Sequence, residues 1–103
     1  MERKEAQSYS DIIMKRIEED ISLFKLSAEL YNDNENAQKC EDTIQCIEEH
    51  PVYAEQFWSE GKELVSIIKL NDICKSLTRL LPEKIRREVN SHINDLIEEC
   101  FAE

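Results

Sequence analysis

The stretch that decides the fold covers residues 50–81 and reads HPVYAEQFWSEGKELVSIIKLNDICKSLTRLL. It is the longest continuously apolar and helical pattern in the chain, and it contains the only Gly and the only Trp. We predict one helix that begins at Pro51, a residue well suited to the first helical position. Gly61 falls among its apolar positions, which predicts either a close helix crossing or a plain kink.

The apolar positions of this stretch change sides midway along it. One face carries Tyr53, Phe57, Gly61, Leu64, Val65 and Ile68. The second set is Ile73, Cys74, Leu77, Leu80 and Leu81. At about 100° per residue the two sets lie roughly 160° apart, so a straight helix would bury opposite faces at its two ends. We therefore predict a break or sharp bend at Asn71 and Asp72, either of which can cap a new helix.

A long amphipathic helix precedes this stretch. Residues 1–7 are charged and aperiodic, and we expect them to be frayed. Ser8 is the expected N-cap, with Asp11 three residues later. The core stripe is Ile13, Ile17, Ile21, Phe24, Ala28 and Tyr31, and a second apolar set is Ile12, Leu23, Leu26 and Leu30. A helix with two apolar faces must be covered on two sides, either by its own bundle or by another chain.

The remaining elements are also helical by pattern. Residues 32–36 are rich in Asn and read as a loop, and a helix over residues 37–49 places Ala37, Cys40, Ile44 and Ile47 on one face. Pro82 starts a last helix to about Phe101, with the stripe Ile85, Val89, Ile93, Leu96 and Cys100. We predict an all-α fold, an antiparallel helical bundle of four to five helices with short loops, forming a single domain over residues 1–103.

Composition excludes several classes of function. One Gly and two Pro cannot build a Gly-rich phosphate loop or a dinucleotide fingerprint. The net charge of −10 repels phosphates and favours a partner with a basic surface, although acidity also simply maintains solubility. No run reaches the length of a membrane span, and the start MERKEAQ has no apolar signal core, so a cytosolic location is the expectation.

The cysteine and histidine residues suggest metal or nucleophile chemistry only weakly. Cys46 and His50 share a helix face, and His92 and Cys100 lie on the last helix. No C-x2-C pair exists, and the other Cys residues fit apolar stripes, so we expect reduced thiols and no metal site. His92 with Asp95 could form a base and its orienter, but no nucleophile is placed beside them. We expect neither a cofactor nor enzymatic activity.

Two surfaces favour recognition of a protein. The acidic face combines two helices and consists of Glu18, Glu19, Asp20, Glu41, Asp42, Glu48 and Glu49. It could meet a basic groove, although a run of acids is more often only a solvated face. Trp58 lies about 100° off the core stripe and is either a lid over the bundle end or a binding hot spot.

Three functions follow, in order of preference. The first is a small acidic protein-binding module, an inhibitor or adaptor that engages a basic surface such as that of a nucleic-acid-processing protein, an inhibitor of phage type included. The second is a homodimer or assembly subunit that buries either the face of Leu23, Leu26 and Leu30 or the face from Ile73 to Leu81, which includes Leu77. The third is a helix-turn-helix-like DNA-binding regulator that uses the basic segment of Lys75, Arg79, Lys84, Arg86 and Arg87. Over that third interpretation we prefer a basic patch that pairs with the acids of residues 37–49 or of Asp95 to Glu103, within the fold or across a dimer. The reason is that the overall charge opposes DNA.

Overall fold

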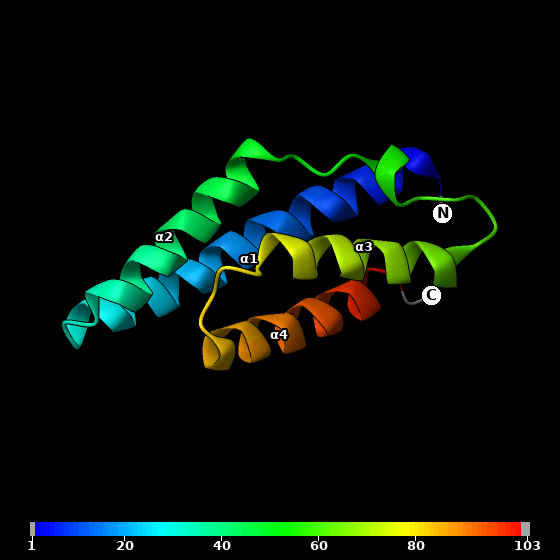
Figure 1. Ribbon diagram of the computed structural model, residues 1–103. Helices are drawn as coiled ribbons and strands as arrows, with labels where there is room; N and C mark the ends of the chain where they lie inside the picture. Colours follow the sequence, from blue (N-terminus) through cyan, green and yellow to red (C-terminus); the bar gives the residue numbers. More distant parts are fainter. Residues whose placement is uncertain (1, 102–103) are drawn as a thin grey trace.

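The computed structural model describes residues 2–101 and confirms an all-α bundle (Figure 1). Its elements are α1 (Arg3–Leu30), α2 (Asn34–Glu49), a 3₁₀ turn η1 (Ala54–Gln56), α3 (Glu63–Leu77) and α4 (Glu83–Phe101). The helix α1 packs against α2 on one side and α4 on the other, and α3 packs mainly on α4. The molecule is elongated, with principal extents of 48 × 23 × 17 Å. Within residues 2–101 no helix is long and apolar enough to cross a membrane.

The helix α1 begins six residues earlier than predicted, with Glu2 and not Ser8 at the N-cap. The expectation of frayed residues 1–7 is wrong for residues 3–7, while Met1 lies outside the described residues. Ala6 is fully buried, and the Gln7 side chain both donates to the Val52 carbonyl (3.0 Å) and accepts from the Ala54 amide (2.6 Å). Ser8 is not a cap, because its hydroxyl donates to the Lys4 carbonyl. A segment distant in sequence thus stabilises the first turns.

Only one of the two apolar faces of α1 is covered. Ile13, Ile17, Ile21 and Ala28 are buried as predicted and Phe24 is partly buried. Tyr31 lies at the turn and is 83% exposed, so its assignment to the core is wrong. The second set, Ile12, Leu23, Leu26 and Leu30, is exposed.

The turn after α1 makes α2 antiparallel to it. Asn32 has a positive φ of 58°, a conformation that Asn tolerates better than most residues. Asp33 caps α2 by accepting from the Asn36 amide (3.2 Å), so α2 starts before the predicted Ala37. It ends at Glu49, as Pro51 requires.

The largest error of the sequence prediction concerns residues 51–62. These residues form an extended connection with the single turn η1, not the start of a helix. Val52, Ala54 and Phe57 are buried there at the end of the bundle. Gly61 has a φ of +76°, and a Cβ built on it would meet nothing within 4 Å. The glycine therefore serves a left-handed turn, and the predicted close crossing is wrong.

The helix α3 is continuous through Asn71 and Asp72, so the predicted break is wrong. The Asn71 side-chain amide donates to Asn94 of α4 (2.5 Å), which ties the middle of α3 to its neighbour. The buried face is Ser66, Leu70 and Cys74. Leu64, Val65 and Ile68 were expected in the core but are 70%, 42% and 52% exposed. The buried side of α3 therefore does not switch along the helix, because the first predicted face, which includes Leu64 and Ile68, is not buried.

The corner after α3 is closed by Leu81, which is 3% exposed. The Thr78 hydroxyl donates to the Cys74 carbonyl (3.0 Å) where the helix ends, so the predicted helix to Leu81 stops at Leu77. The helix α4 follows Pro82 as predicted. It buries Val89, Ile93, Ile97 and Phe101, with Ile85, Leu96 and Cys100 packed at the sides.

Candidate functional site

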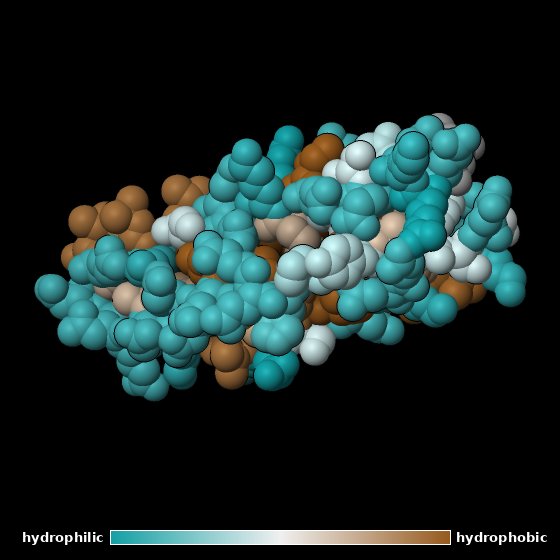
Figure 2. All heavy atoms as spheres, turned by 90° about the horizontal axis from the view of Figure 1, so that it is seen from above, coloured by the Kyte–Doolittle hydropathy of each residue, from teal (hydrophilic) through white to brown (hydrophobic). Residues whose placement is uncertain are grey.

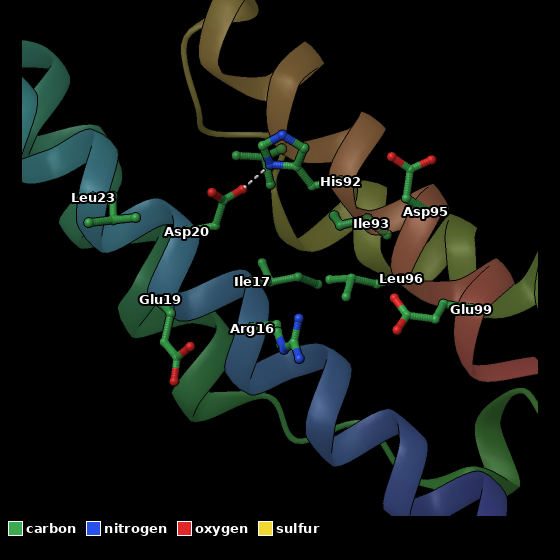
Figure 3. A pocket seen from close by; sticks show the side chains of 11 residues that line it. Arg16, Ile17, Glu19, Asp20, Leu23, His92, Ile93, Asp95, Leu96 and Glu99 are labelled. Carbon is green, nitrogen blue, oxygen red and sulfur yellow. Dashed lines mark hydrogen bonds and ion pairs between the residues drawn. The ribbon is translucent and has the colours of Figure 1, made fainter.

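A groove of about 370 Å³ runs between α1 and α4 (Figure 3). Its apolar floor includes Ile17, Val89 and Ile93, which are at most 2% exposed. Both helices contribute because each places an apolar stripe toward the other. The full lining is Arg16, Ile17, Glu19, Asp20, Leu23, Val89, His92, Ile93, Asp95, Leu96 and Glu99.

The charges around this groove are mostly negative. Glu19 and Asp20 come from α1, and Asp95 and Glu99 come from α4, so each wall carries two carboxylates. The opposing cations are Arg16 and, when protonated, His92. In the close view Asp95 and Glu99 lie on α4 and Glu19 lies on α1, with the Glu19 side chain pointing away from α4 (Figure 3). Such a groove favours a ligand that combines apolar area with positive charge.

His92 and Asp20 join the two walls. The Nδ1 atom of His92 lies 2.7 Å from Oδ2 of Asp20. The pKa of His92 is raised, chiefly by this hydrogen bond and further by the charges of Asp20, Glu88 and Asp95, against a smaller opposing effect of burial. From the sequence we paired His92 with Asp95. In the structure Asp95 raises the pKa of His92 only through its charge. The true partner is 72 residues away and belongs to another helix.

The Asp20–His92 pair predicts a pH dependence of stability. Because folding raises the pKa of His92, its contribution is fully present below the unfolded value of about 6.5 and is lost as pH rises through the folded value. The side chain of His92 is 54% exposed, so we expect less than about 1 kcal/mol. Urea unfolding at a series of pH values should show this loss, and Asp20→Asn should remove most of it, leaving the smaller effects of Glu88 and Asp95. An unchanged pH profile in that variant would contradict the pairing.

The seven acids predicted as one face divide between different surroundings. Glu18 and Glu48 line the same grooves between α1 and α2, and the pKa of Glu18 is raised by burial and by the charge of Glu48. Glu41 accepts from Lys25 of α1 at 2.5 Å. Asp42 and Glu49 accept hydrogen bonds from Gln38 and Gln45 of their own helix. Glu19 lines both one of these grooves and the groove between α1 and α4, whereas Asp20 lines the groove between α1 and α4. The seven acids thus lie over more than one groove.

The thiols are free and mostly buried. Burial raises the pKa of Cys74 to about 12 and also raises the pKa of Cys40 and Cys100, which makes these thiols poor nucleophiles. The Cys46 sulfur lies 3.8 Å from Nδ1 of His50. His92 lies on α4 and contacts Asp20 of α1. Within residues 2–101, no three His, Cys, Asp or Glu side chains are grouped to hold a metal ion.

Trp58 packs over the end of the bundle. Its ring centroid lies 6.0 Å from that of Phe101, and Tyr9 approaches Phe101 from α1 at 5.9 Å. Trp58 remains partly exposed. This position is that of a lid, and a role for Trp58 in binding stays a prediction.

The basic segment faces solvent at the corner between α3 and α4. Arg87 pairs with Glu83 one turn away (2.6 Å), and Arg79 donates to the Ser76 carbonyl. In the part of the chain that the structure describes, no ion pair links this segment to α2 or to the end of α4. Among the described residues, Arg87 is therefore the one base of this segment that forms an ion pair with an acid.

The apolar residues predicted for self-association differ in exposure. Leu23, Leu26 and Leu30 are 67%, 53% and 74% exposed. Leu81 is buried in the core of its own chain and is not available to another chain, whereas Leu77 is partly buried.

Comparisons with protein-family models, with curated proteins and with solved structures found no match to this chain.

Proposed function

We propose that this protein is a non-enzymatic protein-binding module, an inhibitor or adaptor, that holds a basic amphipathic segment of a partner in the groove between α1 and α4. The observation that carries the proposal is the combination of a buried apolar floor with carboxylates on both walls. The net charge of −10 adds a long-range attraction for basic proteins. Surfaces that bind nucleic acids are basic, so nucleic-acid-processing proteins belong to the expected class of partner.

Lys and Arg side chains match both parts of this groove. Their aliphatic stems can lie along the accessible apolar side chains of Leu23 and Leu96, while their charged ends reach the carboxylates of the walls. An amphipathic helix presents such residues on one face at spacings of three and four, which is the usual way a helix binds in a groove. Charge-assisted hydrogen bonds to Asp95 and Glu99 would fix its position.

The test neutralises two carboxylates of the α4 wall. The groove variant is Asp95→Asn with Glu99→Gln, and the matched control is Asp42→Asn with Glu49→Gln, which removes the same charge from α2. The probe is a fluorescent helical peptide with Lys on one face and Leu on the other, titrated by anisotropy at low and moderate salt. We expect the groove variant to weaken binding by about tenfold or more and the control to change it little.

Two outcomes would overturn the assignment. One is equal weakening in both variants, which would mean that only the overall charge matters. The other is a loss confined to the control, which would place the binding surface on α2. A peptide in which each Lys is replaced by Glu serves as the probe for purely apolar binding, and it should bind much more weakly.

A further inference from the structure

The outer face of α1 carries an apolar stripe that no element among residues 2–101 covers. Ile12, Leu23, Leu26 and Leu30 are 48%, 67%, 53% and 74% exposed, although α1 is the central helix of the bundle. The space-filling view shows apolar side chains gathered at the end of the molecule that carries the turn between α1 and α2 (Figure 2). A monomeric protein seldom leaves such a row of large side chains in water.

The stripe has the spacing of a two-stranded helix seam. Alternating steps of four and three residues connect Glu5, Tyr9, Ile12, Arg16, Glu19, Leu23, Leu26 and Leu30. Such steps keep one seam facing a partner helix when two helices wind around each other. The seam carries one pair of opposite charges, Arg16 and Glu19, near its middle, with apolar residues on both sides of this pair and Glu5 at its N-terminal end.

We propose that this face binds α1 of a second copy of the chain in an antiparallel arrangement. A two-fold axis between Ile17 and Glu18, within about one residue of the middle of α1 (Arg3–Leu30), gives the longest overlap. It places Arg16 opposite Glu19 of the second copy, and the symmetry repeats that contact. Ile12 then meets Leu23, and Tyr9, which packs partly against Phe101 of its own chain, meets Leu26. Each position on the seam except the terminal Glu5–Leu30 contact meets a partner of matching chemistry.

Charge selects this arrangement over the parallel one. In a parallel pair in register, Arg16 would face Arg16 and Glu19 would face Glu19, which places like charges on the seam. Within residues 2–101 neither Arg16 nor Glu19 forms an ion pair, so both are available. Beside the seam, Ser8 and Ser22 are small, and their hydroxyls donate to carbonyls of their own helix. The helices can therefore approach without burying unpaired polar groups.

The dimer does not rest on the proposed function. Glu19 and Leu23 also line the groove between α1 and α4, so a bound partner segment and the second copy would compete. The test below uses the pure protein without any peptide, and it changes no residue of α4. If the peptide failed to bind, the dimer proposal would be unaffected. If the parent protein were monomeric, the proposed function of the groove would be unaffected.

The experiment compares four proteins by sedimentation equilibrium over low to high micromolar concentration. We expect the parent to form a dimer, and Arg16→Glu or Glu19→Arg alone to weaken it by about tenfold or more, because each change creates two like-charge contacts. The double variant R16E with E19R restores the opposite pairs and should regain an affinity within a few-fold of the parent. Circular dichroism of each variant reports whether its helices are intact.

A second pair of variants addresses the apolar part of the seam. Leu23→Lys should give a monomer, whereas Leu64→Lys on α3, where the residue is equally exposed at 70%, should leave the dimer unchanged. The proposal is overturned by a parent that stays monomeric at high micromolar concentration. It is also overturned by a double variant no better than the single ones, or by dissociation on changing Leu64.

Discussion

Replacing Phe57 by alanine is expected to lower the free energy of unfolding by about 3–5 kcal/mol. Phe57 is the largest of the fully buried side chains, with 1% exposure, yet it lies in the connection between α2 and α3 and not in a regular helix. Its ring anchors residues 51–62 to the bundle, and its loss would leave a cavity at that end. The loss would be a large share of the roughly 5–15 kcal/mol that typical domains possess.

Guanidinium unfolding followed by circular dichroism measures this effect. The matched control is Tyr53→Ala four residues earlier, where the aromatic ring is 54% exposed, and we expect a much smaller change there. A decrease below about 1 kcal/mol for Phe57→Ala would mean that the connection is not held by this ring.

A second large effect distinguishes the two faces of α3. Leu70→Ala should lower the free energy of unfolding by about 2–5 kcal/mol, because Leu70 is fully buried. Leu64→Ala, on the same helix and of the same chemistry, should stay within about 0.5 kcal/mol, since that side chain is 70% exposed. Both are measured by urea unfolding. The opposite order would restore the face of α3 that sequence periodicity predicted.

The helices with one clear apolar stripe were predictable from sequence. In α4, a single row that includes Val89 and Ile93 fixes both the helix and its buried side. In α2, Cys40 and Ile47 do the same, and Pro51 ends the helix. These elements have polar opposite faces, so only one orientation places their apolar residues away from water.

The stretch over residues 50–81 was predictable only in part, for a physical reason. The spacing of Tyr53, Phe57 and Leu64 imitates a helix, but Gly61 takes a left-handed turn and Phe57 is buried from an irregular segment. In α3 both faces are apolar, and periodicity alone cannot decide which face meets α4. That choice depends on contacts with the neighbouring helix, among them the hydrogen bond that the Asn71 side chain donates to Asn94.

The composition of the candidate site was predictable, but its geometry was not. The acidic character follows from the charge of the chain, and Glu19 and Asp20 were named from their sequence run. The protein partner stays a prediction. Asp95 and Glu99 join them only because α1 packs on α4. The contact of Asp20 with His92 spans 72 residues, and no local pattern indicates it.

The most direct measurement for the central claim is a map of amide chemical shifts in the nitrogen-15-labelled protein during titration with the Lys- and Leu-rich peptide. Binding in the proposed groove predicts shifts on two walls at once, around Glu19 and Leu23 of α1 and from His92 to Glu99 of α4. Shifts concentrated on the outer side of α2, around Asp42 and Glu49, or on α3 around Leu64, would contradict it.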